Sequence, residues 1–164
     1  MLSTSLSLLP AGIINGFMFG AIYALVALGL TLIYGVLHII NFAHGAMLML
    51  ALYSAYFLFK ILNIDPYVAI LIVTPASFIF GYVIYRWGIG KLSGGKDQNI
   101  LLITLGLSII LENAALFFFT GDQQTISLSY SYDSLDLGFL YLSYPKLISF
   151  IASLVICGLL WMLM

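Results

Sequence analysis

The side chains of this sequence that could do chemistry lie mainly inside apolar runs. Thr104, Ser108 and Glu112 recur every four residues, so on a helix they share one face. Glu112 is the only acidic residue in the apolar run from about 100 to 119. A carboxylate inside a membrane costs about 2.5 kcal/mol or more unless it is paired, hydrated or protonated. We therefore expect Glu112 to face protein or a cavity, either on a pathway or in a purely structural hydrogen bond.

A second polar group is the segment Asn41-Phe42-Ala43-His44-Gly45. Asn41 suits the N-cap of a following helix, because its side-chain oxygen can accept from exposed backbone N–H groups. His44 would then lie in the first turn, where the positive end of the helix dipole can face an anion such as a carboxylate. Capping and ligand contact both remain open. His38 and His44 are six residues apart with no acidic or cysteine partner nearby, so the sequence predicts no metal site.

The first apolar run carries a stripe of small residues at intervals of four, namely Gly12, Gly16, Gly20 and Ala24. Such a stripe lets another helix approach closely, so we predict that these residues pack against a neighbouring helix. Asn15 lies beside the stripe. Its amide either lines a pathway or hydrogen-bonds to a neighbouring helix.

The elements that must position these side chains follow from the composition. Hydrophobic residues make up 63% of the 164 residues and charged residues 7%. Soluble domains carry roughly 25% charged residues, so this chain could not cover a water-facing surface. The net charge is -1, and the five basic residues form no patch for nucleic acid. The sequence therefore predicts an all-α, polytopic transmembrane helical bundle in the lipid bilayer, with about five spans of ~20 residues.

We place the spans within one transmembrane domain, 1–164, at about 11–34, 45–62, 67–85, 100–119 and 147–164. The stretch near 35–45 is too apolar for a solvated loop, so we expect a broken or re-entrant element there. Non-helical backbone at membrane depth is tolerated only where protein or a water-filled cavity satisfies it. Apolar and polar residues alternate over 126–133. This period of two predicts a short extracytoplasmic hairpin near 126–142.

Orientation follows from the basic residues. Arg86, Lys91 and Lys96 lie in the connection 86–99, which is therefore predicted to be cytoplasmic. The acidic loop 120–146 then faces outward, and counting back places the N-terminus outside. No basic stop sequence follows the fifth span, so we expect a chain cut off within a longer protein.

The runs 15–35, 40–45 and 103–113, taken together and in this order, resemble one family, the branched-chain amino-acid ABC transporter permeases. The run 15–35 (NGFMFGAIYALVALGLTLIYG) resembles the opening of these permeases, and 40–45 (INFAHG) is similar to their most recognisable short motif. The run 103–113 (ITLGLSIILEN) is similar to their fourth-segment pattern, and the acidic loop follows as it does there. Two departures are Gly90-Lys91, where the family commonly has Arg-Pro, and Ala51, where it often has glycine. The chain is similar only to the N-terminal half of the family permeases.

The resemblance implies a non-enzymatic permease subunit of an ATP-driven importer in the cell inner membrane, moving branched-chain or other neutral amino acids. It implies a second permease subunit, two ATP-binding subunits and an extracytoplasmic substrate-binding protein as partners, and no cofactor in this chain. Asn15, Asn41, His44, Thr104, Ser108 and Glu112 are the candidates for the substrate pathway. ATP hydrolysis would belong to the partners; the run Gly94-Gly95-Lys96 lacks the glycine spacing and hydroxyl of a phosphate-binding loop.

Two other classes stay open at this stage. An intramembrane enzyme could use His44 or Glu112 as acid or base, but no Gly-x-Ser-x-Gly run occurs and Cys157 has no basic neighbour in sequence. The chain could also be a passive channel or a non-functional gene fragment. The sequence does not distinguish a leucine-like substrate from another neutral amino acid, an amide or urea. It also does not distinguish a homodimer from a heterodimer of permeases.

Overall fold

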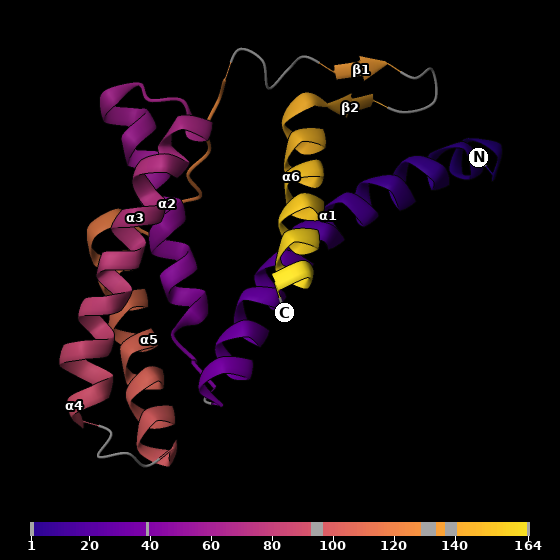
Figure 1. The fold of residues 1–164 in the computed structure, drawn as a ribbon. Helices are drawn as coiled ribbons and strands as arrows, with labels where there is room; N and C mark the ends of the chain where they lie inside the picture. The colour runs from indigo at the N-terminus through magenta and orange to yellow at the C-terminus, as the bar shows by residue number, and fades with distance from the viewer. Residues whose placement is uncertain (1, 39, 93–96, 129–133, 137–140, 164) are drawn as a thin grey trace. The chain divides into compact units, whose positions relative to one another are not determined.

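The computed structural model describes residues 2–38, 40–92, 97–128, 134–136 and 141–163. Their elements, in chain order (Figure 1), are α1 (Leu2–Leu37), α2 (His44–Leu62), α3 (Pro66–Ile84), the π-helix η1 (Tyr85–Ile89), α4 (Gly90–Leu92), α5 (Asp97–Phe119), β1 (Ser134–Asp136), β2 (Tyr141–Ser143) and α6 (Tyr144–Leu163).

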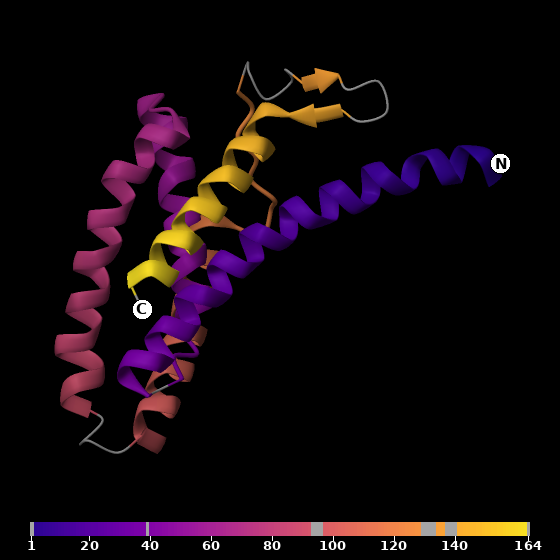
Figure 2. The same ribbon diagram turned by 45° about the vertical axis from the view of Figure 1, so that its right-hand side comes forward.

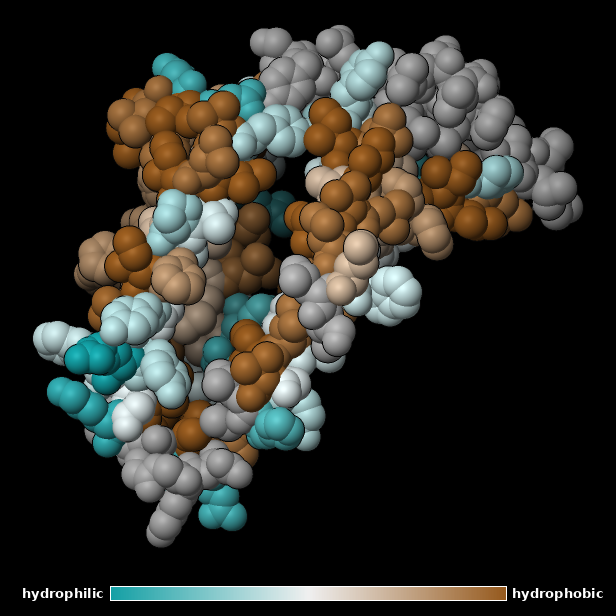
Figure 3. Space-filling model, in the orientation of Figure 1, coloured by the Kyte–Doolittle hydropathy of each residue, from teal (hydrophilic) through white to brown (hydrophobic). Residues whose placement is uncertain are grey.

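Within the described residues, five helical segments are long and apolar enough to cross a membrane: Leu9–Val36, His44–Leu62, Pro66–Ile89, Gln98–Phe119 and Tyr144–Met162. They confirm the polytopic, α-helical fold class. Large apolar side chains are exposed along them, as a lipid-facing surface requires; Leu71 is 76% exposed and Phe117 82% exposed. Figure 3 shows hydrophobic side chains over the flanks of the helices.

The third span is longer than we predicted. We ended it at Tyr85 and expected a polar connection over 86–99, but helix continues through η1 and α4 to Leu92, and α5 has begun by Asp97. The N–H of Gly90 bonds to the carbonyl of Tyr85, five residues earlier, which closes a π-helical turn. Arg86 and Lys91 therefore lie on helix instead of in a loop, and residues 93–96 lie outside the described part.

The chain divides into two units, residues 1–32 with 127–164 and residues 33–126. In the first unit α1 packs against α6. Met18 is 5% exposed, and its partly buried neighbours include Ile14 on α1 and Leu147 and Phe150 on α6. The rings of Phe17 and Phe150 lie 5.8 Å apart between their centroids. Figures 1 and 2 show the short hairpin leading directly into α6.

The hairpin lies later in the chain than the alternating pattern indicated. β1 and β2 pair antiparallel, with Leu135 opposite Leu142. Residues 126–128, where the alternation begins, are in no regular element, and 129–133 lie outside the described part. A period of two shows which residues share a face, but it does not show which segment finds a pairing partner. The pattern therefore located the loop that contains a hairpin without locating its strands.

In the second unit α2 packs against both α3 and α5. Small side chains allow the close approach, because Ala46 on α2, Ala69 on α3 and Ala115 on α5 are all buried. At the end of α5, the ring of Phe119 lies 4.7 Å from that of Tyr53 and 4.8 Å from that of Phe57, both on α2. These contacts hold the end of α5 against the side of α2.

The turn between α2 and α3 has strong local determinants. Asn63 ends α2 in the left-handed conformation, with φ of 53°, which asparagine tolerates better than most residues. Asp65 caps α3, where its carboxylate accepts a 2.9 Å hydrogen bond from the N–H of Tyr67. Pro66 occupies the first helical position, where its missing N–H costs nothing. These residues make α2 and α3 a tight antiparallel pair.

Candidate functional site

The connection between α1 and α2 is irregular backbone over residues 38–43, of which 39 lies outside the described part. α1 ends at Leu37, and the N–H of His38 donates to the carbonyl of Tyr34 at 2.7 Å while His38 adopts a left-handed φ of 55°. α2 begins at His44, so His44 lies in its first turn as expected.

Asn41 does not occupy the N-cap that we predicted for it. The N-cap is Ala43, which makes no side-chain capping bond, and the Oδ1 of Asn41 accepts from the N–H of Ala43 at 3.0 Å. An asparagine can form such a turn with the backbone two residues on, and here this local bond prevails over a cap. The result is a folded loop held by its own side chain ahead of the helix.

This irregular segment lies against the side of α5. The N–H of Phe42 donates to the hydroxyl of Thr104 at 3.4 Å. Thr104 follows the first residue of α5, Asp97, by seven residues, which at 1.5 Å per residue is a depth of about 10 Å along the helix. Non-helical backbone therefore lies within a membrane-spanning segment, as the expected broken element near 35–45 requires.

The polar residues of α5 share one face, as their spacing predicted. Thr104 is 1% exposed and Ser108 is 8% exposed, whereas Glu112 is exposed. The hydroxyl of Thr104 also donates to the carbonyl of Leu101 at 3.1 Å, and the hydroxyl of Ser108 donates to Oε1 of Glu112 at 2.8 Å. The face thus becomes more polar and more exposed from Thr104 toward Glu112.

A cavity of about 560 Å³ adjoins the irregular segment. Small-molecule sites commonly have volumes of about 300–1,000 Å³. Its lining comes from the end of α1, the 38–43 segment, α2, α3, η1, α4 and α5. The lining residues are Ile33, Asn41, Met47, Ser77, Phe78, Gly81, Tyr82, Ile84, Tyr85, Ile89, Gly90, Ile100 and Thr104. The structure thus brings Asn41 and Thr104 into one cavity lining, which His44, Ser108 and Glu112 do not join.

The lining includes a regularly spaced set of residues that were not predicted as site candidates. Ser77, Gly81 and Tyr85 recur every four residues and place one face of α3 and η1 on the cavity. The signal was the same four-residue spacing that marked α5, but serine, glycine and tyrosine are common in membrane helices and did not stand out. Gly90 is also constrained, because an added Cβ would lie 3.1 Å from the carbonyl oxygen of Tyr85.

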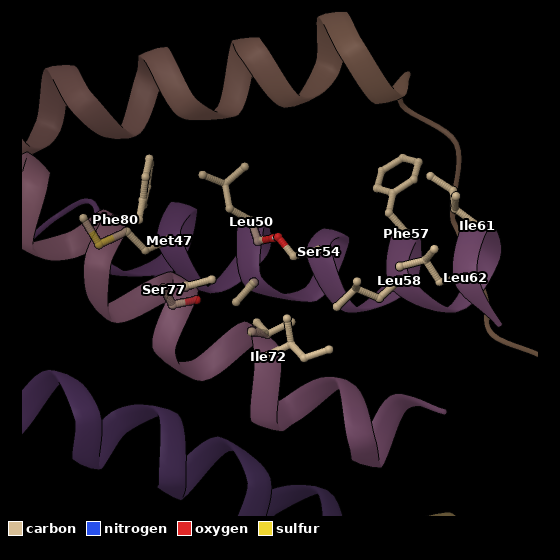
Figure 4. Close-up of a pocket in the computed structure, with 13 residues that line it drawn as sticks. Met47, Leu50, Ser54, Phe57, Leu58, Ile61, Leu62, Ile72, Ser77 and Phe80 are labelled. Atoms are coloured by element: carbon tan, nitrogen blue, oxygen red, sulfur yellow. The ribbon is translucent and has the colours of Figure 1, made fainter. Parts of the chain in front are cut away.

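A second cavity of about 640 Å³ runs between α2 and α3 and shares Met47 and Ser77 with the first. Figure 4 shows Leu58 of α2 beside Ile72 of α3. Among the described residues of this lining, only Ser54 and Ser77 have polar side chains, and the hydroxyl of Ser54 donates to the carbonyl of Leu50 at 2.8 Å. This cavity is an apolar groove without converging polar groups.

Asn15 belongs to the other unit. Its Nδ2 donates to the carbonyl of Ala11 at 2.9 Å, and its Oδ1 accepts from Nζ of Lys146 at 3.4 Å. Lys146 also lies 5.3 Å from the ring centroid of Phe19. Asn15 therefore bonds to its own helix and to the first turn of α6 within its unit.

The small-residue stripe faces outward from its unit. Gly12, Gly16 and Gly20 are exposed, and an added Cβ at each would meet nothing within 4 Å; Ala24 is exposed too. The contact of α1 with α6 uses a different face, the one that carries Met18. The predicted packing role of the stripe stays a prediction. Among the described residues, no group of three His, Cys, Asp or Glu side chains could hold a metal ion.

Five apolar helices and a hydrogen-bonded, irregular segment at membrane depth define a multi-pass α-helical membrane protein. A family model described as the permease component of a branched-chain amino acid transport system matches residues 12–164. The chain belongs to this family, as the sequence resemblance indicated.

Curated relatives agree with this assignment. The chain is 36% identical over 115 residues to the high-affinity branched-chain amino acid transport system permease protein BraD of Pseudomonas aeruginosa, a match covering 63% of this chain and 36% of BraD. It is 32% identical over 107 residues to the permease proteins LivH of Salmonella typhimurium and Escherichia coli K12, covering 60% of this chain and 35% of each relative. The chain thus matches only about a third of the length of these relatives. No solved structure matches.

Proposed function

We propose that this chain contributes membrane-spanning helices to the permease of an ATP-driven importer in the cell inner membrane, and that the importer moves branched-chain or other neutral amino acids. The observation that carries the proposal is the family match over residues 12–164. BraD and LivH are named as high-affinity branched-chain amino acid permeases, which supports this substrate class.

The proposed importer contains a second permease subunit, two ATP-binding subunits and an extracytoplasmic substrate-binding protein. Two surfaces of this chain support contacts with further helices. The stripe of Gly12, Gly16 and Gly20 is open to close approach, and Glu112 lies exposed on an apolar helix, where lipid is a costly neighbour for a carboxylate. The basic end of the third span, with Arg86 and Lys91, suits the cytoplasmic side, where the ATP-binding subunits act.

We propose that the substrate pathway begins at the polar junction of Asn41 and Thr104 and involves His44, Ser108 and Glu112 along the adjoining helices. Neutral amide and hydroxyl groups can exchange hydrogen bonds with a zwitterion without leaving a charge unpaired. Asn15 is a candidate from the other unit. Replacement of His44 or Glu112 is expected to change uptake while assembly stays intact; normal uptake by both variants would remove both residues from the pathway.

Co-purification and reconstitution test the proposal. The protein is expressed from its own gene with an affinity tag, and ATP-binding subunits are expected to co-purify with it. The purified assembly in proteoliposomes, supplied with its binding protein and ATP, is expected to accumulate radiolabelled leucine. Substitution of the catalytic glutamate in the ATP-binding subunits is the matched control and should abolish uptake. An assembly that hydrolyses ATP but moves neither leucine nor any other neutral amino acid would refute the proposal.

The proposed orientation is tested separately. The basic end of the third span, with Arg86 in η1 and Lys91 in α4, predicts that the N-terminus faces outward. A cysteine introduced at Ser3, with Cys157 replaced by Ser, is expected to react with a membrane-impermeant maleimide in intact spheroplasts. A cysteine at Ser93 in the same background is the control that should stay unlabelled. Labelling of position 93 and protection of position 3 would reverse the topology.

A further inference from the structure

We infer that the cavity of about 560 Å³ beside the 38–43 segment is the compartment that receives the side chain of the transported amino acid, and that Gly81 sets the size of side chain that fits. The inference rests on the proposed function and deepens it, because it assigns a specificity-determining residue. Gly81 lies outside every motif that the sequence analysis singled out.

The cavity lies at the depth within the membrane-spanning helices where a substrate compartment is expected. Irregular backbone at membrane depth is stable only where protein or a water-filled cavity satisfies its polar groups. Asn41 from the irregular segment and Thr104 from α5 both line the cavity. The N–H of Phe42, next to Asn41 in the chain, donates to the hydroxyl of Thr104 and joins the two segments. Ser77 extends the lining to the twelfth residue of the helical segment Pro66–Ile89, close to its middle. Transporters place their substrates near this depth, at interrupted helices.

The chemistry of the lining selects a neutral ligand with an apolar part. Among the described residues that line the cavity there is no lysine, arginine, histidine, aspartate or glutamate. A charged side chain in this compartment would be desolvated without an ion partner, which is unfavourable. Ile33, Met47 and Ile100 provide apolar surface, whereas Asn41, Ser77 and Thr104 provide neutral donors and acceptors at its edge. This division matches a zwitterion whose ends are polar and whose side chain is a branched alkyl group.

The absence of a side chain at Gly81 leaves room in the compartment. Gly81 lies between Ser77 and Tyr85 on the cavity face of α3, and an added Cβ would meet nothing within 4 Å. The Cβ of a larger residue at this position therefore meets no clash, and we expect the rest of its side chain to fill space in the cavity. Gly106 on α5 is the matched control: it is also helical and also open at Cβ, but it does not line the cavity.

The test is a competition experiment on the intact assembly in proteoliposomes, with ATP and the binding protein present. Uptake of radiolabelled leucine and alanine is compared among wild type, Gly81→Leu and Gly106→Leu. Gly81→Leu is expected to lower the ratio of leucine to alanine uptake by roughly 10-fold or more, the discrimination that one or two methylenes produce in a hydrophobic pocket. Gly106→Leu is expected to leave this ratio unchanged.

One result would overturn the inference, namely an unchanged leucine-to-alanine ratio in Gly81→Leu. An equal loss of both substrates in an assembly that still hydrolyses ATP is a case of this result. Where Gly81→Leu fails to assemble, Gly81→Ala replaces it, and the ratio should fall in the same direction by a smaller factor; an unchanged ratio again overturns the inference. Failure of the proposed function is a different result, because wild type itself would then move neither leucine nor alanine.

Discussion

The hydrogen bond from the N–H of Phe42 to the hydroxyl of Thr104 joins the irregular segment to α5, and Thr104→Val removes it. Valine keeps the shape of threonine and replaces the hydroxyl by a methyl group. Thr104 is 1% exposed, so water does not readily take the place of the lost acceptor. Hydrogen bonds between membrane helices contribute about 0.6 kcal/mol on average and about 1.7 kcal/mol at most. We expect Thr104→Val to lower the free energy of unfolding by about 1 kcal/mol, within this range.

Hydrogen exchange measures this bond directly. Loss of about 1 kcal/mol of local stability corresponds to roughly fivefold faster exchange of the Phe42 amide, read by mass spectrometry on a peptide spanning 40–45. Global stability is measured by reversible unfolding in mixed micelles. Thr31→Val is the matched control, because the hydroxyl of Thr31 is exposed and donates only to Ala27 of its own helix, at 2.9 Å.

A second variant separates the hydroxyl from packing. Thr104→Ser keeps the hydroxyl but loses a buried methyl group, at a cost of about 0.8 kcal/mol. It should therefore lower global stability while exchange at Phe42 stays slow. The reasoning fails if Thr104→Val and Thr31→Val show the same exchange at Phe42, or if Thr104→Ser speeds that exchange as much as Thr104→Val does.

Three further outcomes follow from single contacts. Ser108→Ala removes the hydroxyl that donates to Glu112 at 2.8 Å. We expect severalfold lower leucine uptake with unchanged co-purification of the partners. Uptake by the variant at the wild-type rate would contradict a pathway role for Ser108 and Glu112. Gly90→Ala places a Cβ 3.1 Å from a backbone carbonyl oxygen and should lower the free energy of unfolding by about 1 kcal/mol or more. Gly88→Ala is the control, because its Cβ would meet nothing within 4 Å. Equal melting temperatures of the two variants would argue against the π-helical turn. Lys146→Met removes the cation that contacts α1, and micelle unfolding should show a loss of under about 1 kcal/mol.

The spans were predictable because lipid imposes a strict rule on the backbone. Only helices or closed barrels satisfy every N–H and C=O group in a bilayer, so long apolar runs could be interpreted one by one. The turn at Asn63 and Pro66 was also predictable from the sequence, because its conformation depends on residues within the turn. The four-residue spacing of Thr104 and Ser108 gave their common face for the same local reason.

The errors arose where alternative hydrogen bonds decide the local structure. Asn41 looked like an N-cap, but its Oδ1 accepts from the N–H of Ala43, and the N–H of Phe42 donates to Thr104, 62 residues away in the chain. The end of the third span was placed too early at Tyr85. Charged and glycine residues suggested a loop there, whereas the π-helical turn closed by Gly90 carries the helix onward. The size and lining of the cavity depend on how α2 packs against α3 and α5, which no local pattern encodes.

The buried polar side chains of the described residues share one property, which would suit helices that shift against one another during transport. Thr104, Ser108 and Ser153 are buried, and all are hydroxyls. Thr104 donates to Leu101 and Ser153 donates to Phe150, in each case three residues back on the same helix. A hydroxyl bonded to its own helix stays satisfied when a contact with another segment opens, whereas a buried ion pair that opens leaves an unpaired charge costing about 3–5 kcal/mol. The bond from Phe42 to Thr104 can therefore be exchanged for a bond to a substrate at little cost. This is why we expect the buried part of the proposed pathway to carry neutral hydroxyls, with the carboxylate of Glu112 at its exposed end.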